Sequence, residues 1–335
     1  MSLRRPTMHD VAREAGVSVA TVSRVVNHER YIRAETREAV ERAIAELGFR
    51  RNESARTLRP GQNTHTVALV IEDVANPFWS GITRGAEDVA RRHSHMLVVG
   101  STRQSFDTER ELLRDLVLRR RVDGLLVVPT GHSQRALHDE LAGWAPIVFI
   151  DRVPGRVAAD SVVLDNHGGA REAVRRLLEL GYRRIAYIGG DPAIGTGARR
   201  LAGYRQALKS AGLAADPALV HVGVHTVEAA HATALALLRG PDPADAVFAD
   251  NNRMAVGVLH AARTHGGGTG VAAFDDLELA DLLPTPVTLV TYDAADLGAR
   301  AAELLFDRIA GVDGPPRRVV LPTTVVTRGG PGRAG

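Results

Sequence analysis

The segment VATVSRVVNH, residues 19–28, carries side chains that could read DNA. At helical spacing, Val22, Val25 and Val26 face one side, where they can join a core. The outward side chains are small, polar or cationic: Val19, Ala20, Thr21, Ser23, Arg24 and Asn27. Because the major groove admits a helix and exposes base edges to hydrogen bonding, this segment is predicted to be a groove-reading helix.

A second set of polar side chains follows the apolar runs beyond residue 66. After TVALVI, PIVFI, RIAYI, AVFA and GVAAF come, respectively, EDVANPFW, DR, GGDPAIGTGARR, DNN and DD. Ligands of parallel α/β sheets bind outside the carboxyl ends of the strands, so these side chains are predicted to converge. Carboxylates, amides, arginines and aromatic rings together suit a polyhydroxylated ligand.

Several enzyme classes are excluded by residue type. The chain has no cysteine, which removes thiolate metal sites, disulfides and cysteine nucleophiles. Its only lysine, Lys209, follows Leu208, so there is no P-loop, and neither GxSxG nor HExxH occurs. Arg200 stands where a dinucleotide fingerprint needs its third glycine in GTGARR, and HGGGTG follows a helical pattern instead of a strand.

The remaining candidates for catalysis are weak. The thirteen histidines lack nearby carboxylates at metal-ligand spacing, so neither a metal nor a cofactor is predicted. Aspartates at strand ends could serve as the acid and base of a glycosidase, but sugar binding needs the same side chains. The prediction is a protein without enzymatic activity.

Three short helices are predicted to position the DNA-reading face. Thr7 and Asp10 form a capping box for MHDVAREA, Gly16 ends that helix, and Ser18 caps the next one. This is a helix-turn-helix pattern. A third helix, AETREAVERAIAEL, closes the core with Val40, Ala43, Ile44 and Leu47 and stops at Gly48.

From Thr66 onward, buried apolar runs alternate with helical patterns, which predicts parallel, doubly wound sheets in two Rossmann-like lobes. The strands expected are TVALVI, MLVVG, DGLLVV, PIVFI, SVVL, RIAYI, ALVHV, AVFA and GVAAF, and the helices 78–92, 107–118, 133–141, 167–180, 197–211, 226–238 and 251–265. The predicted rhythm restarts at SVVL, which is expected to open the second lobe.

Composition places the protein among soluble globular chains. Of its 335 residues, 44% are hydrophobic and 24% are charged, and no apolar run approaches a membrane span or a signal sequence, so we expect a cytoplasmic protein. Residues 1–62 contain 12 arginines and 8 acidic residues, so the net charge of +3 is concentrated at the end where a polyanion would bind.

The stretch TMHDVAREAGVSVATVSRVVNHERYIRAETREAVERAIAELGF resembles the DNA-binding headpiece of the LacI/GalR family along its whole length. By that resemblance, Val19, Ala20 and Arg24 face base edges. The residues expected to contact phosphates are Thr7, Ser18, Thr21, Ser23, Asn27, Tyr31 and Thr36. Sequence discrimination is expected to depend most on Arg24, which can bind guanine O6 and N7.

The segment after Phe49 resembles the family's hinge helix. Residues Asn52, Ala55 and Arg56 are expected to contact DNA there, and Leu58 to insert into a minor-groove step. The chain departs from the family pattern at Arg51, where a proline is frequent, and at Arg33, where a capping Ser or Thr is frequent.

The region beyond the hinge resembles the type I periplasmic sugar-binding fold, on the motifs NPFW, GARRLAGY, ADNNRMAVG and AFDD. The resemblance makes Arg200 and Asp275 the leading ligand contacts. Seven further residues are expected as second-rank ligand contacts: Asp73, Phe78, Trp79, Asp151, Arg152, His225 and Asn251. Each has a structural alternative, because Asp151, Asn251 and Asp275 could cap the following helices and Phe78 or Trp79 could be core.

The predicted organisation is a headpiece at 5–50, a hinge at 51–62 and a ligand-binding and dimerisation domain at 63–330. Its first lobe is expected at 63–160 and 291–318, its second at 161–290 and 319–330. The predicted function is a repressor that binds a pseudo-palindromic operator as a homodimer under control of a small effector, favoured as a carbohydrate. Alternatives are a nucleoside- or purine-responsive regulator, a transcriptional activator or nucleoid-type DNA binder, and a sugar-binding protein without a regulatory role.

Overall fold

The computed structural model describes residues 6–26, 31–49, 63–131, 135–141, 143–153 and 157–330. The chain divides between Thr64 and His65 into two compact units, which are treated separately below. None of the described helices is long and apolar enough to cross a membrane.

The first unit contains three helices: α1 (Met8–Glu14), α2 (Val19–Val26) and α3 (Ala34–Leu47). The predicted capping box is present at Thr7 and Asp10, and the Ser18 hydroxyl accepts from the amide of Thr21 at 3.1 Å. The core buries Val11, Ala12, Val22, Val25, Val40 and Ala43. Gly16 and Gly48 end α1 and α3 in the left-handed conformation, where a side chain would be strained.

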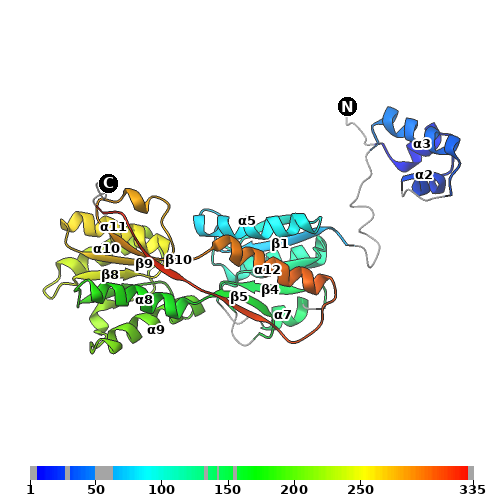
Figure 1. The fold of residues 1–335 in the computed structure, drawn as a ribbon. Helices are drawn as coiled ribbons and strands as arrows, with labels where there is room; N and C mark the ends of the chain where they lie inside the picture. The colour runs from blue at the N-terminus through cyan, green and yellow to red at the C-terminus, as the bar shows by residue number, and fades with distance from the viewer. Residues whose placement is uncertain are drawn as a thin grey trace. The chain divides into compact units, whose positions relative to one another are not determined.

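The second unit is built on two six-stranded sheets (Figure 1). The first has the order β11-β5-β4-β3-β1-β2. Its strands are β1 (Thr66–Ile71), β2 (Met96–Ser101), β3 (Gly124–Val127), β4 (Ile147–Ile150), β5 (Asp160–Leu164) and β11 (Arg318–Leu321). Every pairing in this sheet is parallel, and the strands β1, β3, β4 and β5 are almost wholly buried.

Helices cover both faces of the first sheet. One face packs against α5 (Pro77–Arg92) and α12 (Ala294–Ile309). The other packs against α6 (Phe106–Arg114), the π-helical turn Asp115–Arg119 and α7 (Arg135–Leu141). The expected helix 107–118 therefore ends as an α-helix at Arg114 and continues as a wider turn.

The second sheet has the order β12-β10-β9-β8-β6-β7. Its strands are β6 (Ile185–Ile188), β7 (Val220–His221), β8 (Ala246–Ala249), β9 (Gly270–Phe274), β10 (Val287–Thr291) and β12 (Thr324–Arg328). Only the β10–β12 pairing is antiparallel. The expected strand ALVHV is shortened to the two residues of β7, because its first two residues belong to a 3-10 turn, Pro217–Leu219, in which Asp216 accepts from the amide of Ala218.

Two pairs of helices enclose the second sheet. On one face lie α8 (Asn166–Glu179) and α9 (Gly195–Ser210), and on the other α10 (Val227–Arg239) and α11 (Asn252–His265). A short 3-10 helix, Ala280–Leu282, precedes β10. Figure 1 shows the C-terminal strands, drawn in red, passing from one lobe to the other.

The predicted division of the lobes was wrong at two strands. SVVL was expected to open the second lobe, but β5 lies in the first sheet between β4 and β11. The prediction also placed most of β11 in the second lobe, but β11 pairs with β5 in the first sheet. Sequence could not decide this, because every buried parallel strand shows the same apolar run. The chain crosses between lobes after β5, after β10 and after β11.

Candidate functional site

The outward surface of α2 provides the candidate DNA-binding face of the first unit. Ala20 and Arg24 are exposed, whereas Thr21 and Ser23 are half-buried. Val19 is also half-buried and packs against the helical core. Apolar burial of Val19 leaves Arg24 as the long side chain of this face that can reach a base edge.

The other predicted DNA contacts of this unit lie around α2. Thr7 and Ser18 cap α1 and α2, so their hydroxyls lie at helix N-termini, where backbone amides favour phosphate oxygens. Tyr31 is 91% exposed and Thr36 lies in the first turn of α3. Asn27, Asn52, Ala55, Arg56 and Leu58 lie outside the described residues.

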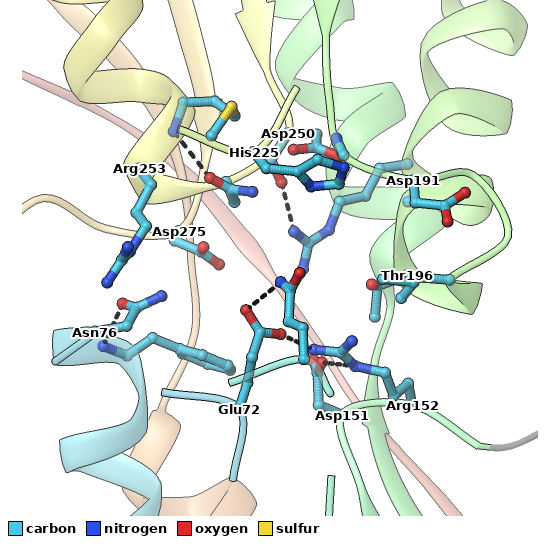
Figure 2. Close-up of a pocket in the computed structure, with 18 of the residues that line it drawn as sticks. Glu72, Asn76, Asp151, Arg152, Asp191, Thr196, His225, Asp250, Arg253 and Asp275 are labelled. Atoms are coloured by element: carbon cyan, nitrogen blue, oxygen red, sulfur yellow. Dashed lines mark hydrogen bonds and ion pairs between the residues drawn. The ribbon is translucent and has the colours of Figure 1, made fainter. Parts of the chain in front are cut away.

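A cleft of about 750 Å³, open to solvent, lies between the two lobes of the second unit. Loops at the carboxyl ends of β1, β4, β6, β8 and β9 line it, as the doubly wound pattern predicts. Figure 2 shows side chains from both lobes pointing into this space, with Glu72, Asp151 and Arg152 facing Asp250 and His225.

The first lobe contributes a buried charged network. The Arg152 guanidinium donates to Glu72 at 2.6 Å and to Asp151 at 3.3 Å, and Gln104 donates to the other Glu72 oxygen at 2.6 Å. Asp151 is 4% exposed and adopts a left-handed backbone with φ 67°. Burial raises the pKa of the Asp151 carboxyl, despite the opposing charges of Arg152 and Arg200.

Arg200 forms the centre of the second lobe's contribution. Its Nε donates to Asn166 Oδ1 at 2.7 Å, one terminal nitrogen donates to the backbone oxygen of Asp250, and the guanidinium lies 3.8 Å above the Phe274 ring. Burial lowers the pKa of Arg200, but Asp275, Asp151 and Asp250 raise it more, so the group stays charged. The remaining terminal nitrogen, Nη2, has no partner among the described residues and is available to a ligand.

Two aspartates flank Arg200. Asp250 follows β8 and accepts from the Gly190 amide at 3.0 Å and the Tyr187 hydroxyl at 3.3 Å. Asp275 follows β9, with φ 75°, and accepts from the Asn252 amide at 3.1 Å and from the Tyr292 hydroxyl. Burial raises the pKa of Asp250 and also of the Tyr292 hydroxyl, while the charge of Arg200 lowers both.

At the mouth of the cleft the lobes touch directly. The Asn76 and Asn252 side chains exchange hydrogen bonds of 2.7 and 3.4 Å, and Arg253 donates to Asp73 at 2.6 Å. Asn76 also caps α5 by accepting from the Phe78 amide. The described conformation is therefore one in which loops of both lobes meet over the ligand space.

Comparison with known proteins bears on both units. A model of the bacterial regulatory proteins of the lacI family matches residues 7–52, and a periplasmic binding protein-like domain matches residues 174–330. The transcriptional regulator CelR of Thermobifida fusca is 38% identical over 339 residues, covering 97% of this chain and 98% of CelR. This chain belongs to the lacI family of bacterial regulatory proteins. It is a DNA-binding transcriptional regulator, as its relatives are.

Further relatives of this lacI-family regulator support the same assignment. GalS of Salmonella typhimurium is 33% identical over 324 residues, covering 95% of each chain. A solved CelR–cellobiose complex has a TM-score of 0.71 at 36% identity and covers 96% of this chain and 98% of that one. The lac repressor dimer bound to operator and the anti-inducer ONPF has a TM-score of 0.83 at 26% identity with the same coverages. The predicted fold class is confirmed.

Of the nine predicted ligand contacts in this lacI-family regulator, eight line the cleft. The exception is Asp73, which instead holds Arg253 across the cleft mouth. Asn251 has the structural role foreseen as its alternative, because its side-chain oxygen caps α11 by accepting from Met254. Trp79 is 3% exposed and belongs both to the hydrophobic core and to the lining of the cleft, so the predicted contact and its structural alternative both apply.

Five further polar residues that line the cleft were not among the nine individually predicted contacts: Glu72, Asn76, Gln104, Asp250 and Arg253. Glu72, Asn76 and Asp250 lie in the strand-end segments EDVANPFW and DNN that were predicted to converge, but they were not singled out as ligand contacts. Gln104 had no such signal, because it reaches the cleft from a left-handed turn with φ 60° after β2. The structure describes no cluster of residues that could hold a metal ion.

Proposed function

We propose that this lacI-family regulator is a repressor that binds a pseudo-palindromic operator as a homodimer, under the control of a sugar or sugar-like effector. The observation that carries the proposal is the union, in one chain, of a helix-turn-helix unit with a two-lobed cleft lined by polar side chains. DNA binding assigns the protein to the cytoplasm, where bacterial DNA lies.

The proposed DNA interface comprises two kinds of contact. Val19, Ala20 and Arg24 face base edges, whereas hydroxyl and amide groups position phosphates. The positioning residues are Thr7, Ser18, Thr21, Ser23, Asn27, Tyr31 and Thr36. The hinge contacts are Asn52, Ala55, Arg56 and Leu58, with Leu58 as the minor-groove wedge. Exposure of Ala20, Arg24 and Tyr31 supports this assignment.

The proposed effector site is the interlobe cleft. Arg200 Nη2 donates to ligand oxygens and the aspartates accept from hydroxyl groups, while Phe78 and Trp79 supply apolar surface for a ring face. The solved structure of CelR, which is 36% identical to this chain, is a complex with cellobiose. This similarity supports a carbohydrate as the effector of the present regulator.

The proposed mechanism couples the cleft to the headpiece. An effector that contacts both lobes favours the conformation in which they meet, and the linker between the units transmits that preference to the two headpieces of a dimer. The lac repressor dimer bound to its operator, with a TM-score of 0.83, supports the dimeric arrangement. Matching the two-fold symmetry of the protein, the operator should be pseudo-palindromic.

Selection of genomic DNA fragments by the purified full chain tests the DNA arm of the proposal. We expect enrichment of one pseudo-palindrome, protected in a footprint at fixed salt concentration. Thermal unfolding with monosaccharides, disaccharides and nucleosides tests the effector arm, because a ligand of the native state raises the melting temperature. We expect Arg200→Ala to lose every such shift in melting temperature.

If no sequence is enriched over random DNA, the proposed role as a repressor is refuted. If the shifts in melting temperature persist in Arg200→Ala, the proposed location of the effector site in the cleft is refuted.

A further inference from the structure

Two buried carboxylates in the cleft each keep one oxygen without a donor. Asp151 is 4% exposed and Asp250 is 3% exposed, and among the described residues no donor reaches Oδ1 of either. Their Oδ2 atoms accept hydrogen bonds from Arg152 in one case and from Gly190 and Tyr187 in the other. A buried acceptor without a donor costs free energy, so both oxygens favour a ligand that donates.

The two unpartnered oxygens come from different lobes. Asp151 follows β4 of the first sheet, and Asp250 follows β8 of the second. Both residues line the same cleft, on opposite sides of it in Figure 2. A ligand with donors at both ends would satisfy one oxygen from each lobe and so connect the lobes.

The charge of the cleft wall disfavours anions. Five carboxylates line it, Glu72, Asp151, Asp191, Asp250 and Asp275, against three guanidinium groups. Two of those guanidinium groups are engaged, Arg152 by Glu72 and Asp151 and Arg253 by Asp73. One free nitrogen of Arg200 is left, facing three aspartates that already stabilise its charge. A phosphate here would meet more negative than positive charge at short range.

Helix N-termini favour anions, and the N-termini of α5, α9 and α11 lie at the cleft. α5 and α11 are capped by Asn76 and Asn251, and Asp275 accepts from the first amide of α11. α9 has no side-chain cap, and its N-terminal residues Thr196 and Gly197 line the cleft. The Asp250 carboxylate lies close to that end, 3.8 Å from the position a Cβ on Gly197 would take, so the positive end of α9 already has an anion beside it.

We infer that the effector is an uncharged, polyhydroxylated molecule whose hydroxyl groups donate to Asp151 and Asp250, and that Asp250 makes the cleft select against phosphorylated or carboxylated sugars. The inference rests on the proposed function and specifies its effector. Burial raises the pKa values of both aspartates, and a ligand hydroxyl group that donates to either one would favour its carboxylate form.

Titration calorimetry on the full chain tests the inference with matched pairs: glucose and glucose 6-phosphate, trehalose and trehalose 6-phosphate, adenosine and AMP, with cellobiose as a larger neutral probe. The tightest probe should be neutral and should bind at least tenfold more tightly than its phosphorylated partner. Asp250→Asn and Asp151→Asn should each weaken the affinity for that neutral probe tenfold or more. Asp250→Asn should also reduce the ratio between the affinity for the neutral probe and the affinity for its phosphorylated partner.

Melting temperatures of the unliganded variants separate recognition from folding. Asparagine keeps an oxygen for Gly190 and Tyr187 while removing a buried charge, so Asp250→Asn should melt no lower than the parent chain. A lower melting temperature together with unchanged affinity would overturn the inference. Glu278→Gln, an exposed carboxylate outside the cleft, is the charge-matched control and should leave affinity unchanged.

The two proposals fail in different ways. A phosphorylated probe that binds as tightly as its neutral partner, and that Arg200→Ala abolishes, would overturn the inference while leaving the effector site in the cleft. Binding that Arg200→Ala does not alter would instead overturn the proposed site, and the inference with it. No response to any probe in the panel would count against both.

Discussion

Arg200 makes several contacts within the protein and is also a leading predicted ligand contact. The same guanidinium bonds Asn166, bonds the backbone of Asp250 and stacks on Phe274, so it is fixed before a ligand arrives. A fixed donor loses little conformational freedom on binding, which favours affinity. Asp151 and Asp275 lie at strand ends in left-handed backbone conformations, a strain that is frequently found at functional sites.

Arg24 is the residue on which operator choice is expected to depend. Arg24→Ala removes the planar donor pair that can bind guanine, so affinity for the selected operator should fall by about 1–3 kcal/mol, with little change for random DNA. Gel-shift titrations of both DNAs at one salt concentration measure the ratio. Arg42→Ala, an exposed arginine of α3, is the control. An equal loss on both DNAs would make Arg24 a phosphate contact.

Asp160 is expected to control stability and its pH dependence. This buried carboxylate at the start of β5 accepts from Arg308 at 2.9 Å and from the Arg317 amide at 2.7 Å. Burial raises its pKa, but these hydrogen bonds together lower it more, so the pKa lies below the ordinary value. Asp160→Asn should lower the free energy of unfolding by about 2–4 kcal/mol at pH 7.

The sign of the pH effect at Asp160 follows from the lowered pKa. The stabilisation is complete above the unfolded pKa of about 4 and is lost as pH falls through the lower folded value. The difference between Asp160→Asn and the parent chain in urea unfolding should therefore shrink below about pH 4. A difference that stays constant with pH would assign the loss to packing. Asp307→Asn, which removes the more exposed partner of Arg317, should cost less.

At the scale of elements, local capping and close helix packing set the geometry. α1 and α2 carry side-chain caps, but α3 begins after Arg33, which makes no capping bond. In the second unit, α5 and α12 approach closely because Gly85 and Gly298 have no side chains: a Cβ on either would lie about 2 Å from a backbone oxygen of the other helix. These helices cover one face of the first sheet.

The missing cap of α3 leads to a stabilising prediction. Arg33→Ser places a hydroxyl where it can accept from an amide of the first turn, which should stabilise the helix by about 0.5–1 kcal/mol. Hydrogen exchange of α3 amides in the full chain should slow by about two- to fivefold, the rate equivalent of that free energy. Arg42→Ser removes the same charge in mid-helix and should not slow exchange. Slowing by both variants would point to net charge instead of capping.

At the scale of the whole second unit, the decisive feature is that two lobes share one cleft and three crossings of the chain. The lobes meet at the mouth through Asn76 with Asn252 and Asp73 with Arg253. These contacts are partly exposed, so they bias the closed state modestly and leave most of the closing free energy to a ligand.

A double-mutant cycle tests the contact at the mouth of the cleft. Arg253→Ala and Asp73→Ala should each weaken effector binding by about two- to fivefold, the range of a partly exposed ion pair. The double variant should lose no more than either single one. Calorimetry with the tightest neutral probe gives the affinities, and small-angle scattering should show a larger unliganded radius for both single variants. Additive losses would mean that Arg253 acts on the ligand directly.

Much of this protein was determined locally by its sequence. The headpiece followed from caps, turn glycines and helical periodicity, all of which act within a few residues: Thr7, Gly16 and Ser18 act as predicted. Strand-end polar residues were found by the same local rule, because parallel strands deliver their carboxyl ends to one edge.

Only the tertiary structure decided which strands share a sheet and which polar groups find partners. β5 and β11 pair with each other in the first lobe, where Asp160 binds Arg308 and Arg317 across more than 140 residues of chain. Asn251 became a helix cap, Asp73 a partner of Arg253, and Asp250 an acceptor with an unfilled oxygen. Apolar runs and polar residue types are properties of short segments, whereas burial and hydrogen-bond partnership depend on segments that meet only after folding.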